Sequence, residues 1–266
     1  MIQNSLKIAL VMLFTLTFTA CNGSGSATPS STTQLQSIVK SGELVLGTSG
    51  NMVPMTHAIN DGKDAIGFDI DLARTMAQSM DAKLVIKVMP FDELLSALEN
   101  GDVDMVISNM TINPKRNTQV AFVGPYMTSG KCLVTKMPDL AAADKEQLNK
   151  ASNKLAVLKG STSEEYVKLA MPNVVALSVD SQEEAIQMVR DTKVSALLTD
   201  YPVCKATILN NPDDEFVSVF SKLTYEPIGI AINPNNTHLI NWTENFLERA
   251  ENVGLFNVLA AKWLGN

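Results

Sequence analysis

The residues best suited to chemistry lie in polar segments that follow predicted strands. In open α/β sheets, ligands bind beyond the carboxyl ends of the strands, and four such segments occur here, residues 47–52, 108–116, 159–163 and 199–200. Two of them contain side chains of opposite charge, Arg116 and Asp200. A guanidinium can hold a carboxylate with two parallel hydrogen bonds, and a carboxylate can pair with an ammonium group. Each also has a simpler interpretation: Arg116 as a solvated side chain in a polar run, and Asp200 as the N-cap of a helix near Pro202.

The elements that must position these residues alternate between strand-like and helix-like patterns. The first half predicts strands over residues 44–46, 84–88 and 105–107 and helices over 68–80 and 93–99. After a polar stretch over 138–154, the pattern restarts with strands over 155–158, 174–176 and 196–198 and helices over 164–170 and 181–190. A strand over 228–232 and helices over 238–252 and 255–263 complete the chain. This order predicts an α/β fold with two similar units, each a mostly parallel sheet flanked by helices.

The N-terminus has the features of a bacterial export signal. Lys7 precedes an uninterrupted run of apolar and Thr residues over 8–20, which is shorter than the roughly 20 residues that a membrane-spanning helix needs. The run ends in Phe18-Thr19-Ala20-Cys21, which resembles a lipobox with Cys21 as the lipidated residue. The alternative is cleavage after Ala20 with Cys21 as a free thiol. We expect residues 1–20 to be a signal peptide and 21–34 a lipid-anchored flexible tether, because residues 22–33 include no large apolar side chain.

The composition argues against several other functions. The formal net charge is −7 and no basic cluster occurs, so nucleic acid is not an expected partner. Two histidines and three cysteines offer little for a metal site, and we expect neither a metal nor a cofactor. Cys132 and Cys204 could form a disulfide in an oxidising compartment, but Cys132 lies in an apolar stretch and is interpreted most simply as a small buried residue.

Six short motifs, in order, carry a resemblance to a known family. They are Gly67-Phe68-Asp69-Ile70-Asp71-Leu72-Ala73, Met105-Val106-Ile107-Ser108-Asn109-Met110-Thr111-Ile112-Asn113-Pro114-Lys115-Arg116, Gly124-Pro125-Tyr126, Gly160-Ser161-Thr162, Gly229-Ile230-Ala231 and Lys262-Trp263-Leu264-Gly265. From about residue 42 to 265 the chain resembles the bacterial extracellular solute-binding proteins of family 3, the polar amino-acid receptors of ABC importers. The resemblance implies a two-lobe periplasmic-binding-protein-like fold of type II with two hinge crossovers. Residues 35–128 and 229–266 would form the first lobe and residues 129–228 the second, closing on a ligand by hinge motion.

The resemblance also implies roles for individual residues. Arg116 matches the arginine that holds the ligand carboxylate, and Asp200, in the second lobe, matches the residue that pairs with the ligand ammonium. Smaller contributions are implied for Thr111 and Thr162, which would hydrogen-bond the carboxylate, and for Asn109 and Leu158, which would contact the ligand through backbone groups. Phe91 and Met52 would flank the ligand side chain, although Met52 stands where the family usually has Tyr or Phe. Ser49 stands where several relatives carry an acidic residue, which favours a neutral amino acid as the ligand.

The implied function is binding without catalysis. The protein would capture a small amino-acid-like ligand in the periplasm or at the cell surface and deliver it to the permease of an ABC importer. It would act as a monomer attached to a membrane by its lipid anchor. One alternative is a periplasmic cyclohexadienyl or prephenate-type dehydratase on the same fold, for which Glu164, Glu165 and His57 are the candidate acid–base residues. Another alternative is the ligand-binding partner of a sensory receptor.

Overall fold

The computed structural model of the protein describes residues 32–218 and 224–265. The predicted signal peptide, Cys21 and the tether up to Ser31 lie outside these residues. The described part begins with α1 (Gln34–Ser41), whose N-cap, Thr33, accepts a hydrogen bond from the Gln36 backbone N–H. Such capping satisfies backbone donors that have no partner within the first turn of a helix.

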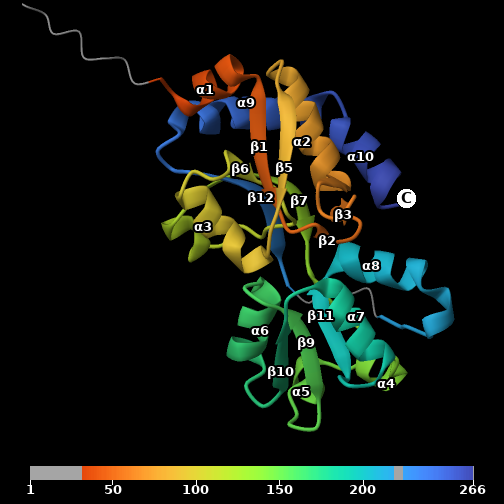
Figure 1. Cartoon of the computed structure of the whole chain (residues 1–266). Coiled ribbons are helices and arrows are strands. Elements are labelled where there is room, and N and C mark those ends of the chain that lie inside the picture. The colour runs from red at the N-terminus through yellow and green to blue at the C-terminus, as the bar shows by residue number, and fades with distance from the viewer. Residues whose placement is uncertain (1–31, 219–223, 266) are drawn as a thin grey trace, which may run out of the picture. The chain divides into compact units, whose positions relative to one another are not determined.

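A five-stranded sheet forms the core of the first lobe (Figure 1). Its strands, in spatial order, are β5 (Lys83–Val88), β1 (Glu43–Thr48), β6 (Met105–Val106), β12 (Glu226–Ile232) and β7 (Ala121–Ser129). β1 pairs in parallel with β5 and β6, whereas β12 is antiparallel to both of its neighbours. Four of these five strands therefore run in one direction, which confirms the mostly parallel sheet predicted from the sequence.

Helices cover both faces of this sheet because its strands bury side chains on both sides. On one face, Leu44 and Leu46 belong to a core that includes residues of α2 (Phe68–Ser79), α9 (Thr237–Asn252) and α10 (Leu255–Trp263). On the other face, Val45 and Val106 pack with α3 (Leu94–Glu99). This alternation follows from the two-residue period of a strand.

The second lobe contains a four-stranded sheet in the order β10 (Val175–Val179), β9 (Lys154–Leu158), β11 (Ala196–Asp200) and β8 (Lys131–Val134). β9 is parallel to β10 and β11, whereas β8 is antiparallel to β11. Helices α6 (Thr162–Ala170), α7 (Gln182–Arg190) and α8 (Tyr201–Asn210) pack against it. Two separate buried clusters, one on each face, show that this lobe has its own core.

The two crossovers are adjacent strands. β7 leaves the first sheet and continues through Gly130 into β8, and β12 brings the chain back. Ser129 and Glu226 are partners in the antiparallel β7–β12 ladder. The crossovers therefore enter the second lobe where Lys131 and Glu226 begin their strands, and a hinge at this place stays a prediction.

Several elements escaped prediction from the sequence. A small antiparallel sheet comprises β2 (Asn51–Met52), β3 (Thr56–Ile59) and β4 (Asp64–Ile66). The polar stretch over 138–154 contains the short helices α4 (Pro138–Ala141) and α5 (Lys145–Leu148). Single 3₁₀ turns occur at η1 (Phe91–Glu93), η2 (Arg116–Thr118) and η3 (Pro212–Asp214).

The cysteines also differ from expectation. Cys132 on β8 and Cys204 on α8 form a disulfide with their Cα atoms 6.5 Å apart. The bridge that the sequence left open is therefore formed, although the simplest interpretation of Cys132 did not include it. The two residues are 72 positions apart in sequence, and only the packing of α8 against β8 brings them together. Both cysteines are nevertheless buried, as expected for Cys132.

Candidate functional site

A narrow cavity lies where the carboxyl ends of strands from both sheets meet. Its volume is about 10 Å³, which is room for about one water molecule. Eight of the nine residues singled out from the sequence line it: Met52, Phe91, Asn109, Thr111, Arg116, Leu158, Thr162 and Asp200. Ser161, Ser163, Gln182 and Thr199 complete the lining. An amino acid is larger than this space, so the surrounding elements must move apart to admit one.

Arg116 opens the 3₁₀ turn η2 and is only 9% exposed. Its Nη1 donates to the Thr111 carbonyl at 2.8 Å and its Nη2 to the Gly160 carbonyl at 3.0 Å. The guanidinium carbon also lies 5.5 Å from the centre of the Phe91 ring. Burial lowers the pKa of Arg116, opposed by Glu165, Asp200 and Glu226, and an arginine stays charged in proteins. A guanidinium has five N–H donors. The two hydrogen bonds found among the described residues leave further donors for a ligand.

Asp200 ends strand β11 and occupies the N-cap position of α8, but its side chain makes no capping hydrogen bond. Its Oδ2 instead accepts from Asn109 Nδ2 at 2.7 Å, and its Oδ1 accepts from Lys131 Nζ at 2.6 Å. Asp200 is therefore at the N-cap position, as the simpler interpretation held, but its carboxylate does not cap the helix. A carboxylate can accept about four hydrogen bonds, so this group has capacity beyond its two observed donors.

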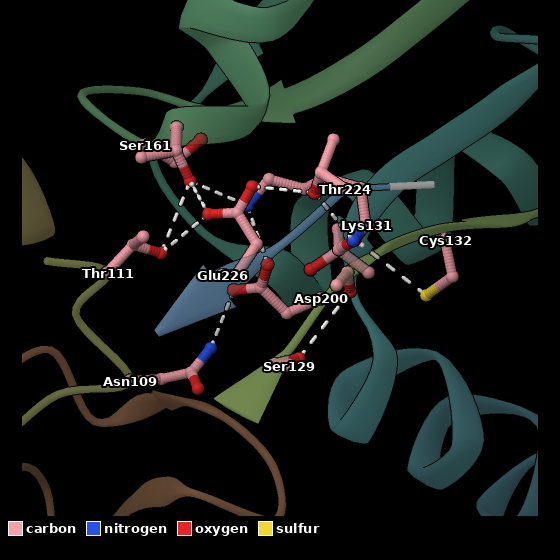
Figure 2. A network of polar contacts seen from close by, with 12 residues as sticks. Asn109, Thr111, Ser129, Lys131, Cys132, Ser161, Asp200, Thr224 and Glu226 are labelled. Atoms are coloured by element: carbon pink, nitrogen blue, oxygen red, sulfur yellow. Dashed lines mark hydrogen bonds and ion pairs between the residues drawn. The ribbon is translucent and has the colours of Figure 1, made fainter. Parts of the chain in front are cut away.

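Lys131, like Glu226, was not predicted from the sequence. It is 1% exposed, and its Nζ lies 2.6 Å from Thr162 Oγ1, 2.6 Å from Asp200 Oδ1 and 3.5 Å from Glu226 Oε2. Figure 2 shows Lys131, Asp200 and Glu226 within one polar network. The sequence offered one signal: a lysine opens the short strand β8, whose other residues are apolar and which is buried throughout. A buried lysine needs acidic partners.

Glu226 completes this network. Its Oε2 accepts from the hydroxyls of Thr111 at 2.9 Å and Thr162 at 3.0 Å, and its Oε1 accepts from Thr224 at 2.7 Å. Burial alone would raise the pKa of Glu226, but the Lys131 ammonium and these three hydroxyls bring it below its usual range. Glu226 is therefore ionised at neutral pH.

Thr111 and Thr162 line the cavity as the resemblance implied, whereas Ser49 does not. The Thr111 and Thr162 hydroxyls both donate to Glu226, so they support an acid group of the protein. Ser49 does not line the cavity, because its N–H and its hydroxyl are both bonded to the Ser108 hydroxyl, at 2.9 and 3.0 Å. Any contact of these three residues with a ligand stays a prediction.

Asn109 adopts a left-handed conformation, with φ +49°, and it is held in place by a fully buried carboxylate. Asp69 Oδ2 accepts from the Asn109 N–H at 2.6 Å, and Asp69 Oδ1 accepts from the Tyr126 hydroxyl at 2.8 Å. Burial raises the pKa of Asp69 to about 7, against the lowering effect of both hydrogen bonds. Within the described residues, Asn109 Oδ1 is buried without a hydrogen-bond donor. Such a group indicates that a donor arrives from elsewhere.

Contacts between the lobes surround the cavity. Lys115 pairs with Glu165 at 2.6 Å, and Lys159 pairs with Asp92 at 2.9 Å. The Arg116–Gly160 hydrogen bond also joins the two sides. The described conformation is therefore closed, which accounts for the small volume of the cavity.

Comparison with known proteins places the chain in a family. The sequence profile of the bacterial extracellular solute-binding proteins, family 3, matches residues 44–266. The chain belongs to this family. A crystal structure of an ancestral amino acid-binding protein, AncCDT-1, described as a precursor of cyclohexadienyl dehydratase, is similar at 33% identity with a TM-score of 0.79, covering 87% of this chain and 99% of that one. That similarity confirms the type II two-lobe fold for this solute-binding protein.

Curated relatives include both binding proteins and an enzyme. ABC transporter arginine-binding protein 1 of Escherichia coli is 26% identical over 216 residues, or 79% of this chain and 86% of the relative. Cyclohexadienyl dehydratase of Pseudomonas aeruginosa is 25% identical over 233 residues, or 87% of this chain and 86% of the relative. Membership of family 3 therefore does not by itself exclude catalysis.

The three candidate acid–base residues do not line the cavity. Glu164 Oε2 accepts from the Gly160 N–H, and its Oε1 accepts from Lys168 and Ser178. Burial would raise the pKa of Glu164, but these donors lower it below the usual range, which does not suit a general acid at neutral pH. Glu165 pairs with Lys115, and His57 lies on β3.

No helix in the described part of the chain is long and apolar enough to cross a bilayer. Among residues 32–218 and 224–265, no three His, Cys, Asp or Glu side chains are grouped so that they could hold a metal ion.

Proposed function

We propose that this solute-binding protein captures a free α-amino acid between its lobes and delivers it to the permease of an ABC importer. One observation carries the proposal: Arg116 and Asp200 line the same cavity from opposite lobes, and neither has used its full hydrogen-bonding capacity. Arg116 would bind the ligand carboxylate through its remaining N–H donors. Asp200 would bind the ammonium, which would also supply a donor to Asn109 Oδ1.

Closure would follow from the same contacts. Arg116 belongs to the first lobe and Asp200 to the second, so a ligand that holds both charges links the lobes. We propose that residues 35–128 and 229–266 move against residues 129–228 about the β7–β12 crossovers. Hinge closure of this kind is a common response to a small ligand.

We also propose where the protein is located. The apolar run over 8–20 and Cys21 support export followed by lipid anchoring, with the body held near a membrane as a monomer. Globomycin blocks lipoprotein signal-peptide cleavage. In bacteria that express this protein, treatment with globomycin should cause the unprocessed precursor to accumulate. Processing that is unchanged when Cys21 is replaced by Ser would count against the anchor.

Titration calorimetry with the twenty amino acids tests the ligand class. The protein is first unfolded, dialysed and refolded to remove carried ligand. We expect binding of at least one amino acid, and no binding of its analogues that lack the carboxylate or the ammonium. Arg116→Ala should weaken binding by about 2–5 kcal/mol, because it removes one partner of a desolvated charge pair. Lys150→Ala, at an exposed cation outside the cavity lining, is the control and should bind almost normally.

Catalysis is the competing proposal because one relative is a cyclohexadienyl dehydratase. We propose that this chain is not an enzyme, and the lowered pKa of Glu164 and its position outside the cavity support this. Incubation with prephenate or arogenate should release no aromatic product. Turnover that Glu164→Gln abolishes would establish the enzyme instead.

A further inference from the structure

Lys131 is a buried cation beside the cavity. It is 1% exposed, and its ammonium has three partners within 3.5 Å. The contacts with Asp200 Oδ1 and Thr162 Oγ1 are hydrogen bonds, and the contact with Glu226 Oε2 is an ion pair. A buried charge would lose these partners by moving, so we expect Lys131 to keep its place when a ligand enters.

Lobe opening does not dismantle this cluster either. Lys131 and Asp200 are direct partners in the β8–β11 ladder of one sheet. Glu226 begins β12 opposite Ser129, two residues before Lys131, so Lys131 and Glu226 both lie at the crossovers. Because its members are joined through strand pairing at the crossovers, we expect the cluster to persist when the lobes open.

The charges around the cavity balance without a ligand. Arg116 and Lys131 contribute two positive charges, and Asp200 and Glu226 contribute two negative ones. The other charged pairs at the cleft, Lys159–Asp92 and Lys115–Glu165, are each neutral. Arg116 and Asp200 are the two charged residues of the cavity lining, and Lys131 and Glu226 lie behind it, bonded to its residues Asp200 and Thr162.

We propose that Lys131 determines the net charge of the ligand: it neutralises one of the two buried carboxylates, so the site accepts amino acids with uncharged side chains and rejects cationic ones. This inference rests on the proposed function. A zwitterion adds no net charge to the closed site, whereas lysine or arginine adds a positive charge with no carboxylate left to pair with it. Burying an unpaired charge is strongly unfavourable. The inference sets this chain apart from its relative in Escherichia coli that is named for arginine.

Charge-changing substitutions test the inference by the ratio of two affinities. Calorimetry measures the affinity for the best neutral amino acid and for lysine and arginine. The wild-type protein should prefer the neutral ligand by roughly 30-fold or more, the effect expected of one unpaired buried charge. Lys131→Met leaves one carboxylate without its cation, and the preference should fall by a similar factor. Lys131→Met combined with Glu226→Gln restores the balance and should restore the preference.

Glu226→Gln alone provides a test of opposite sign. It leaves an excess positive charge, so aspartate and glutamate should gain affinity relative to the neutral ligand, and lysine should lose it. Lys150→Met removes an exposed cation that lies outside the cavity lining and should change the ratios by no more than about twofold, because exposed charges are screened. Circular dichroism establishes that each variant is folded. If Lys131→Met does not fold, Glu226→Gln still decides the outcome.

The outcomes separate this inference from the proposed function. A wild-type protein that binds no amino acid overturns both. A wild-type protein that binds lysine or arginine as tightly as any neutral amino acid overturns only the role of Lys131. Unchanged ratios in both the Lys131→Met and the Glu226→Gln proteins also overturn that role, while amino-acid binding stands.

Discussion

Raising the pH from about 4 to about 8 should destabilise this protein through one buried carboxylate, that of Asp69. The side chain is 0% exposed, and burial raises its pKa to about 7. In the unfolded chain the pKa of Asp is about 3.9. The folded state therefore binds this proton more tightly than the unfolded state. The resulting stabilisation is complete below about pH 4 and is lost as the pH rises through about 7.

The size of the effect follows from the two pKa values. Their difference corresponds to roughly 4 kcal/mol in the free energy of unfolding. Asp69→Asn removes the titration, while its amide can still accept from the Asn109 N–H and donate to the Tyr126 oxygen. The quantity to compare is the free energy of unfolding of the wild-type protein minus that of Asp69→Asn. This difference should decrease by up to that amount as the pH rises across this range. Asp139→Asn, at an exposed carboxylate on α4, is the matched control.

Urea unfolding at a series of pH values measures this difference. Tyr126→Phe provides a second test, because the Tyr126 hydroxyl lowers the pKa of Asp69. Its removal should move the loss of stability to higher pH. Parallel curves for the wild-type and Asp69→Asn proteins from about pH 4 to about pH 8 would refute the reasoning, since they would show that Asp69 titrates alike in the folded and unfolded states.

Three further predictions concern the disulfide, a glycine and the aromatic wall. Replacing Cys132 and Cys204 with Ala should lower the free energy of unfolding by about 4 kcal/mol, the entropic expectation for a loop of this length, and an unchanged urea midpoint would contradict it. Gly67→Ala should prevent stable folding, because φ is +138° and a Cβ would lie 2.2 Å from the Met55 carbonyl oxygen; normal thermal unfolding would refute this. Phe91→Leu should weaken amino-acid binding by about 0.5–2 kcal/mol through loss of its contact with the Arg116 guanidinium, and calorimetry showing an unchanged affinity would exclude that contribution.

Much of the two-sheet architecture was predictable because apolar periodicity marks its strands and helices. The helix predicted over 68–80 is α2 (Phe68–Ser79), and the helix predicted over 255–263 is α10 (Leu255–Trp263). The crossover strand β7 was missed because Gly124 and Pro125 interrupt it, and both residues are unfavourable in strand interiors. α8 was considered only through the N-cap interpretation of Asp200, because its apolar residues do not form a stripe along one face.

The candidate site was predictable only in part. Arg116 and Asp200 each follow a predicted strand. Their proximity was predictable because ligands bind beyond the carboxyl ends of such strands. Lys131 could not be paired with Asp200 from the sequence, because their contact depends on the antiparallel register of β8 and β11. The same limit applies to Glu226, whose position depends on the β7–β12 ladder. Strand register is a tertiary property that single-sequence periodicity does not encode.

A crystal structure of the protein with its tightest-binding amino acid tests the central claim most directly. The account predicts that the ligand carboxylate lies within hydrogen-bonding distance of the Arg116 guanidinium and that the ammonium contacts Asp200 and Asn109 Oδ1, with Lys131 still paired to Glu226. A ligand bound in the opposite orientation, or outside the cavity between the lobes, would contradict it.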